Sequence, residues 1–220
     1  MAWVDEDGLL QAHTGDILRV HYDLRPHDYG PLETTSGLPE ILVWHLTGTR
    51  RAESCHDSVC DGSEGMATRI EDGTARCYGH GLLASDGWFH QSIPFNRSAI
   101  AVSGMWHGKE VNHVGTHIEV TNLGFVRPSG EMPGGVPVDL EREDLRQHGR
   151  LAWQMLPPQQ ASAIIEIADA WRQWTRRAVE DCLRGHADVN PADGHADPGP
   201  ELRAYLDTVV RSHLEAMEIF

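Results

Sequence analysis

Short apolar runs, separated by segments rich in Gly, Pro and Asp, predict β-strands along the first half of the chain. The run from Ile41 to Leu46 is continuous, which is typical of a strand buried on both faces. A Ser-Asp-Gly turn at 85–87 lies between two apolar segments and indicates a β-hairpin. The predicted strands are residues 17–22, 41–46, 81–84, 88–91, 99–105 and 115–120.

The second half of the chain changes to a helical period. After Pro157-Pro158, apolar residues recur every three or four positions and predict a long amphipathic helix, which Gly185 is expected to end. A last helix is expected from Pro200. The predicted buried stripes are Ile164, Ile167, Ala168, Trp171, Thr175, Ala178 and Cys182 in the long helix, with Trp174 also in the core, and Leu202, Leu206, Val209 and His213 in the last one. Residues 24–39, 47–76 (with one short helix) and 124–140 are predicted loops.

Strands interspersed with helices predict an α/β (α+β) fold with a central mixed β-sheet of five or six strands flanked by helices. A chain of 220 residues is long enough for one domain with a substantial core. We therefore expect a single domain over residues 1–220, in which residues 1–39 form an N-terminal extension that packs on the rest and residues 201–220 form a C-terminal helix.

Composition excludes several classes of partner. The formal net charge of −15 argues against nucleic acid, whose phosphates are bound by Lys and Arg, and against anionic membranes. No segment reaches the roughly 20 apolar residues of a membrane helix. The acidic start at residues 1–7 lacks the features of a secretory signal, so a cytoplasmic location is expected, with release by lysis or non-classical export left open.

The cysteines do not suggest a thiolate metal site. Cys55, Cys60, Cys77 and Cys182 include no Cys-x-x-Cys pair, which argues against a zinc ion held by four thiolates. Free thiols are expected without a secretory signal, while a disulfide between Cys55 and Cys60 stays open.

Candidate chemistry lies in two separated segments. His45 stands near the end of the buried apolar run, and His186 and Asp197 lie eleven positions apart in a segment stiffened by Pro and Gly. Imidazole and carboxylate are ligands that zinc takes, and three protein ligands plus a water form a catalytic zinc site. Taken singly, His45 is better explained as a hydrogen-bonded core residue, and His186 and Asp197 can be a capping and turn pair, since Asp before Pro-Gly is a normal turn former.

Five motifs, in this order, resemble those of a known family. They are Leu42-Val43-Trp44-His45-Leu46-Thr47, Gly79 to Gly87, Trp106-His107-Gly108, Asn112 to Val120 with Ile118-Glu119 near its end, and Gly185-His186-Ala187-Asp188 … Asp197-Pro198-Gly199-Pro200. Together they resemble the zinc-dependent N-acetylmuramoyl-L-alanine amidases that share their fold with peptidoglycan recognition proteins. The resemblance covers residues 40–200 and implies that fold for the central sheet.

Carried over residue by residue, the resemblance implies Zn²⁺ held by His45, His186 and Asp197. It implies that Glu119 is the catalytic carboxylate. His195 stands where the cytoplasmic amidases have a Lys, two residues before the last ligand, and is the candidate group beside the oxyanion. Because the tripeptide His-Ala-Asp occurs twice, His195 in place of His186 is an open alternative as ligand.

Other histidines receive weaker assignments. His80 and His107 are candidate substrate-binding residues, with packing or support of the ligands as the alternative. His113 and His117 are expected at the surface.

The resemblance implies hydrolysis of the amide bond between N-acetylmuramic acid and L-alanine in peptidoglycan or muropeptides. Zinc would activate a water and polarise the carbonyl, and Glu119 would pass a proton from the water to the departing amine. Two alternatives stay open, namely a non-catalytic muropeptide-binding protein on the same fold and a zinc hydrolase of a different amide. The negative charge favours soluble wall fragments, or brief contact with the wall, over lasting adhesion to it. A recycling enzyme, a phage lysis enzyme and a delivered effector are all compatible with the sequence, which does not indicate an oligomeric state.

Overall fold

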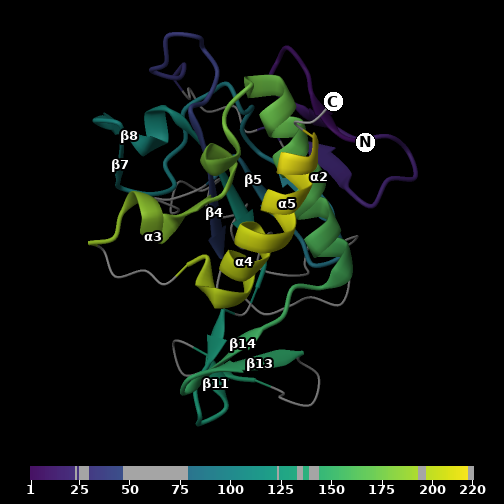
Figure 1. Ribbon diagram of the computed structural model, residues 1–220, viewed down its shortest axis with the longest axis vertical. Helices are drawn as coiled ribbons and strands as arrows, with labels where there is room; N and C mark the ends of the chain where they lie inside the picture. The colour runs from purple at the N-terminus through teal and green to yellow at the C-terminus, as the bar shows by residue number, and fades with distance from the viewer. Residues whose placement is uncertain are drawn as a thin grey trace.

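A six-stranded mixed β-sheet forms the centre of the protein, as the sequence predicts (Figure 1). The computed structural model describes residues 1–22, 24, 30–46, 79–122, 124–132, 136–138, 144–192 and 197–217. The strand order is β15-β4-β9-β5-β6-β3, in which only β5 and β6 pair antiparallel. The strands are β15 (Arg184–Gly185), β4 (Ile41–Leu46), β9 (Gly115–Val120), β5 (Gly81–Leu83), β6 (Trp88–Gln91) and β3 (Arg19–Tyr22).

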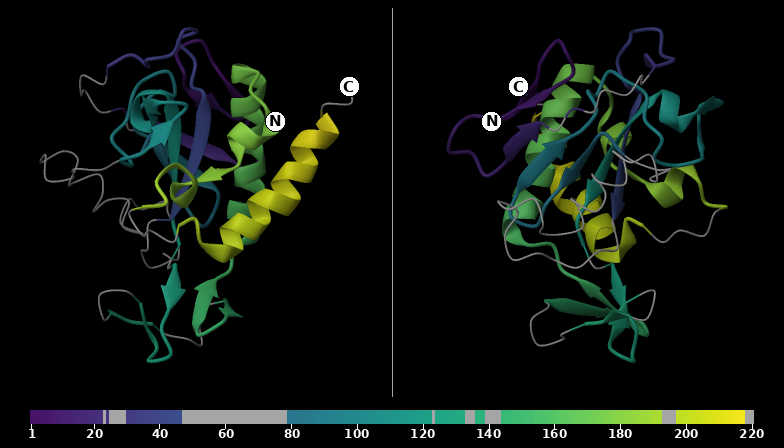
Figure 2. Two further views of the ribbon diagram at one scale, coloured as in Figure 1. Left: turned by 60° about the vertical axis from the view of Figure 1, so that its left-hand side comes forward. Right: turned by 180° about the vertical axis from the view of Figure 1, so that it is seen from behind.

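Helix α2 (Pro158–Thr175) covers one face of this sheet, and the C-terminal helical segment packs beside it (Figures 1 and 2). That segment runs through α4 (Gly199–Tyr205), η3 (Leu206–Val210) and α5 (Arg211–Ala216). The main core lies between these helices and the sheet, and it contains the fully buried Trp44 and Trp171. The Trp171 indole N–H donates to Thr116 Oγ1 at 2.9 Å, which joins the helix to the centre of the sheet. Trp174 packs against this core while partly buried.

The opposite face of the sheet carries a smaller apolar cluster. Ile41 and Val43 of β4 contact Val102, Val111 and Val189 there. Side chains alternate between the faces of a strand, so odd-numbered residues of β4 and β9 point to this side. Short elements line this face, namely β7 (Met105–Trp106), β8 (Lys109–Glu110), η1 (Val111–His113) and α3 (His186–Val189). Strand β1 (Trp3–Val4) instead packs near α2 and pairs with β2 (Leu10–Gln11).

A separate group of short strands projects from one end of the main sheet (Figure 1). Strand β14 (Leu151–Gln154) lies between β10 (Phe125–Val126) and β13 (Leu145–His148), and β11 (Glu131–Met132) pairs with β12 (Val136–Pro137). Part of this region falls in the stretch 124–140, so the prediction that the whole stretch is a loop was wrong. These strands are short and do not form apolar runs. They are defined by pairing with one another, which local periodicity does not reveal.

Most predicted strands of the main sheet are confirmed. Strands β4 and β9 have the predicted bounds, the hairpin of β5 and β6 forms around the Asp-Gly turn, and β3 is two residues shorter than expected. The prediction of a strand at 99–105 was wrong except for its last residue, Met105, which begins β7. Asn112 Oδ1 accepts the backbone N–H groups of Ala101 and Val102, both at 3.0 Å, which replaces a strand ladder with a side-chain contact.

The long helix ends ten residues before the predicted Gly185. Arg176 adopts a left-handed conformation with φ of 59°, and its N–H donates to the Arg172 carbonyl at 2.8 Å, which closes the helix. A short 3-10 turn, η2 (Val179–Cys182), then leads into β15. The apolar period continues through η2 because its buried residues pack on the same core, so periodicity alone overestimates the helix.

The buried stripe of the last helix also differs from the prediction. Leu202, Leu206, Val210 and Leu214 are buried, whereas Val209 is 45% exposed and His213 lies outside the core. The prediction used mixed three- and four-residue spacing, while the observed stripe repeats every four residues through the wider turn at η3. No helix among the described residues is both long and apolar enough to cross a membrane.

Candidate active site

Three neighbouring parallel strands bring the candidate residues to one edge of the sheet. In the register of β4 and β9, His45 lies directly opposite Glu119. Trp44 lies opposite Gly185 of β15, so the next residue, His186, leaves the sheet beside His45. Because these strands are parallel, their carboxyl ends meet at the same edge, where open α/β sheets generally bind ligands.

The donor atoms of His45, His186 and Asp197 have the spacing of a metal site. Asp197 Oδ2 lies 3.4 Å from His45 Nδ1 and 3.4 Å from His186 Nδ1, and all three donor atoms lie within 4.8 Å of one another. Two ligands that bind zinc at about 2.1 Å with tetrahedral angles are roughly 3.4 Å apart. The two histidines are buried and the carboxylate is nearly so, and the residue types suit zinc. The site therefore fits the metal that the motifs imply.

A close backbone approach delivers Asp197 to the histidines. The Ala187 N–H donates to the Asp197 carbonyl at 3.2 Å, which ties the 197–199 turn to the start of α3. A Cβ on Gly185 would lie only 2.1 Å from Pro198 Cδ, so Gly is required where this turn crosses β15. On the other side, a Cβ on Gly199 would lie 2.4 Å from the Trp153 ring of β14, which encloses the turn between two elements.

The pKa values of the two carboxyl groups at this edge are shifted in opposite directions. Burial raises the pKa of Glu119, and the negative charge of Asp197 raises it further against the opposing effect of His45. Burial also disfavours the charged form of Asp197, but the adjacent His186 and His45 side chains outweigh this effect and hold the pKa of Asp197 well below its usual range. One carboxylate is thus suited to bind a cation and the other to exchange a proton.

A second layer of histidines lies behind His45. His45 Nε2 is 3.2 Å from His117 Nδ1, and His117 Nε2 is 3.4 Å from the Val111 carbonyl oxygen. The His117 backbone N–H donates to His80 Nδ1 at 3.0 Å, while the His80 backbone N–H donates to the His117 carbonyl at 2.8 Å. Burial lowers the pKa of His80 to about 4 and that of His117 well below its usual value, so both rings are neutral near pH 7.

The family model for N-acetylmuramoyl-L-alanine amidase matches residues 35–200, which is most of the chain. The chain belongs to this family. The match includes every residue of the strand-edge cluster described above. No match was found among curated proteins.

Solved structures of three amidase-like proteins resemble this fold. The crystal structure of AmpD has a TM-score of 0.54 at 17% identity and aligns over 92% of this chain and 98% of that one. AmiD from E. coli has a TM-score of 0.51 at 18% identity, covering 92% of this chain and 65% of that one. Drosophila PGRP-LB has a TM-score of 0.53 at 14% identity, covering 87% and 94%. At these identities the likeness supports the shared amidase fold.

The structure places the other histidines and the cysteines singled out in the sequence in different surroundings. His80 is fully buried, and its Nε2–H donates to the Arg97 carbonyl at 2.8 Å, so its position gives no support to a substrate contact and fits the alternative of packing and support. His107 is exposed on the turn between β7 and β8, with its ring against Trp106. His195, Cys55, Cys60 and Cys77 lie outside the described residues, and Cys182 is a buried free thiol.

His117 was missed by sequence reasoning, which expected it at the surface together with His113. The side chain is fully buried beneath His45. One signal was available, because His117 lies two positions before Glu119 in a strand and therefore points to the same face. His113 does lie near the surface, with its Nδ1 3.0 Å from Glu33 Oε1.

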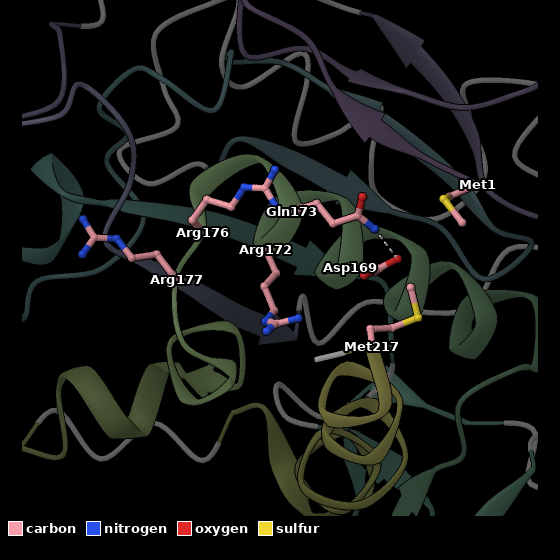
Figure 3. A pocket seen from close by; sticks show the side chains of 7 residues that line it. All are labelled: Met1, Asp169, Arg172, Gln173, Arg176, Arg177 and Met217. Atoms are coloured by element: carbon pink, nitrogen blue, oxygen red, sulfur yellow. Dashed lines mark hydrogen bonds between the residues drawn. The ribbon is translucent and has the colours of Figure 1, made fainter. Parts of the chain in front are cut away.

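A cavity of about 400 Å³ lies beside the C-terminal end of α2 (Figure 3). Its lining comes from the chain N-terminus, α2 and the end of α5, and comprises Met1, Asp169, Arg172, Gln173, Arg176, Arg177 and Met217. Arginines at this position interact favourably with the helix dipole. The Gln173 amide donates to Asp169 Oδ2 at 2.9 Å within the cavity wall, and the arrangement holds no feature of the amidase chemistry.

Proposed function

We propose that the protein is a zinc-dependent N-acetylmuramoyl-L-alanine amidase, which hydrolyses the bond between N-acetylmuramic acid and L-alanine in peptidoglycan or muropeptides. The observation that carries this proposal is the convergence of His45, His186 and Asp197 beside Glu119 at the carboxyl ends of three strands. Three protein ligands leave a coordination position open, as a catalytic zinc site requires. AmiD, which shares the fold, was crystallised with a muropeptide substrate.

His45, His186 and Asp197 would hold the zinc ion. When bound, zinc would polarise the scissile carbonyl and make a water molecule nucleophilic at neutral pH. Glu119 would accept the proton of the attacking water and then donate it to the departing L-alanine nitrogen. Its raised pKa favours this exchange, because a proton-transfer group works best when its pKa lies near the working pH.

The projecting strands lie close to the proposed metal ligands. The turn that carries Asp197 is enclosed by Trp153 of the projecting strands, and Glu201 of α4 accepts from Arg146 at 3.4 Å and pairs with His148. These contacts fix the projecting strands beside the metal ligands, where they would form a wall of a substrate site. His195 would lie beside the oxyanion in this proposal.

The proposed substrates are soluble muropeptides or wall polymer contacted briefly, in a cytoplasmic protein. The net charge of −15 opposes lasting contact with anionic polymer. The decisive experiment combines zinc analysis of the purified protein with release of L-alanine-containing peptides from a defined muropeptide. One zinc per chain together with cleavage at the muramoyl–alanine bond is the expected result. Zinc without cleavage would instead favour a muropeptide-binding protein or a hydrolase of another amide.

A further inference from the structure

His45 uses both ring nitrogens, and the two face different partners. Nδ1 faces Asp197 Oδ2 at 3.4 Å, on the side of the proposed metal. Nε2 faces the interior, 3.2 Å from His117 Nδ1. A neutral imidazole carries one proton, and only the nitrogen without it can bind a metal. Whichever group fixes the proton of His45 therefore decides whether Nδ1 is available.

The proton positions follow from the groups at the end of the chain of contacts. The carbonyl oxygen of Val111 can only accept, so the Nε2 of His117 that faces it carries the proton. His117 Nδ1 then has a lone pair and can only accept. His45 Nε2 must therefore be the donor, which leaves the lone pair of His45 Nδ1 directed toward Asp197 and His186.

The opposite assignment is disfavoured by burial. It would place two lone pairs against each other at 3.2 Å, or require His117 to reverse its proton and lose the bond to Val111. His117 is fully buried, so water does not compensate such a loss. A buried polar group that loses its hydrogen-bond partner destabilises the folded protein.

We propose that His117 is a positioning residue of the metal site, which accepts a hydrogen bond from His45 Nε2–H and so presents His45 Nδ1 to the metal. This inference rests on the proposed zinc site. His80 makes the arrangement rigid, because its ring accepts from the His117 N–H, its own N–H donates to the His117 carbonyl, and its Nε2–H is held by Arg97. The rings of His80 and His117 also stack, with 5.9 Å between centroids and 14° between planes.

The first test measures zinc affinity by competition with a chelator. His117→Phe keeps a ring but removes the acceptor, and we expect zinc affinity to fall about 10–100-fold, as is usual when the partner of a metal-bound histidine is lost. His117→Asn places an amide oxygen near the position of Nδ1 and should restore most of that affinity. Thr116→Val is the matched control, because it removes a buried hydrogen bond from the adjacent residue of β9, on the opposite face of the sheet.

The outcomes separate the two proposals. Native zinc affinity in His117→Phe, or equal losses in His117→Asn and His117→Phe, would overturn the role of His117 while leaving the zinc site intact. An equal loss in Thr116→Val would show that destabilised β9, and not the acceptor, causes the effect. A wild-type protein that binds no zinc would refute the zinc site and this inference together.

A second measurement does not depend on a folded variant. Long-range ¹⁵N–¹H NMR of the wild-type protein without metal distinguishes the two tautomers of each histidine. We expect the proton on Nε2 in His45, His117 and His80. A proton on His117 Nδ1, with none on His45 Nε2, would overturn the proposal.

Discussion

Gly185→Ala should disable the metal site through a single methyl group. The Gly185 backbone has φ of −113° and ψ of 172°, which any residue adopts, so the substitution introduces no backbone strain. The new Cβ would lie 2.1 Å from Pro198 Cδ and 2.7 Å from Pro198 Cγ. The proline ring cannot rotate away as a flexible side chain would. The 197–199 turn must therefore move.

The size of the movement follows from van der Waals contact. Carbon atoms pack at about 3.5 Å or more, so the 2.1 Å separation must grow by about 1.4 Å. Metal–ligand distances tolerate changes of only about 0.2 Å. Asp197 precedes Pro198 directly, so we expect zinc affinity to fall at least about 100-fold. Overpacking of this kind costs about 1–3 kcal/mol, which lowers the Tm of a chain of this size by roughly 2–12 °C.

The assay is zinc titration against a competing chelator, with thermal unfolding of the metal-free protein recorded in parallel. Gly30→Ala is the matched control, because a Cβ there would contact, among the described residues, only Ser98 Oγ, at 3.6 Å. We expect native zinc affinity in that control. A folded Gly185→Ala protein with native zinc affinity would show that the turn at Pro198 does not position Asp197, and the reasoning would fail.

Three further predictions follow from the site and the core. Glu119→Gln should keep zinc but lower kcat about 10²–10⁴-fold, because an amide cannot accept the proton, and near-native turnover would remove Glu119 from the mechanism. His186→Ala should lose stoichiometric zinc in elemental analysis while His195→Ala keeps it, and the reverse result would favour His195 as the ligand. Gln91→Leu should lower the free energy of unfolding, measured in urea, by about 3 kcal/mol or more and leave zinc affinity unchanged, because the Gln91 amide is hydrogen-bonded to the backbone of Gly8, Leu10 and Ile93. A smaller loss would mean that these backbone groups find other partners.

The sequence predicted those elements whose signal is local. The run from Ile41 to Leu46 and the segment from Gly115 to Val120 become strands with the expected bounds, because each is a short, largely apolar segment between turn residues. The hairpin around Asp86-Gly87 forms for the same reason. The order of the motifs along the chain also indicated the amidase family, and the matching family model confirms it.

Other features depend on contacts between distant parts of the chain. The helix that begins at Pro158 ends at Thr175, although its apolar period continues toward Cys182, because the following turn packs on the same core. The strands from β10 to β14 have weak local patterns and are defined by their pairing partners. His117 looked like a polar surface residue until the neighbouring strand placed His45 above it.

The site shows the same division. The sequence by itself determined which residue types are present and that His45 and Glu119 stand near the ends of strands. Only the tertiary structure decided that these strands are parallel neighbours in a register that sets His45 opposite Glu119. It also decided that the turn with Asp197 crosses β15 closely enough to reach both histidines. That close approach is possible because Gly185 has no side chain. Local periodicity carries no information on such distances, because they arise from strand register and from packing between segments far apart in the sequence.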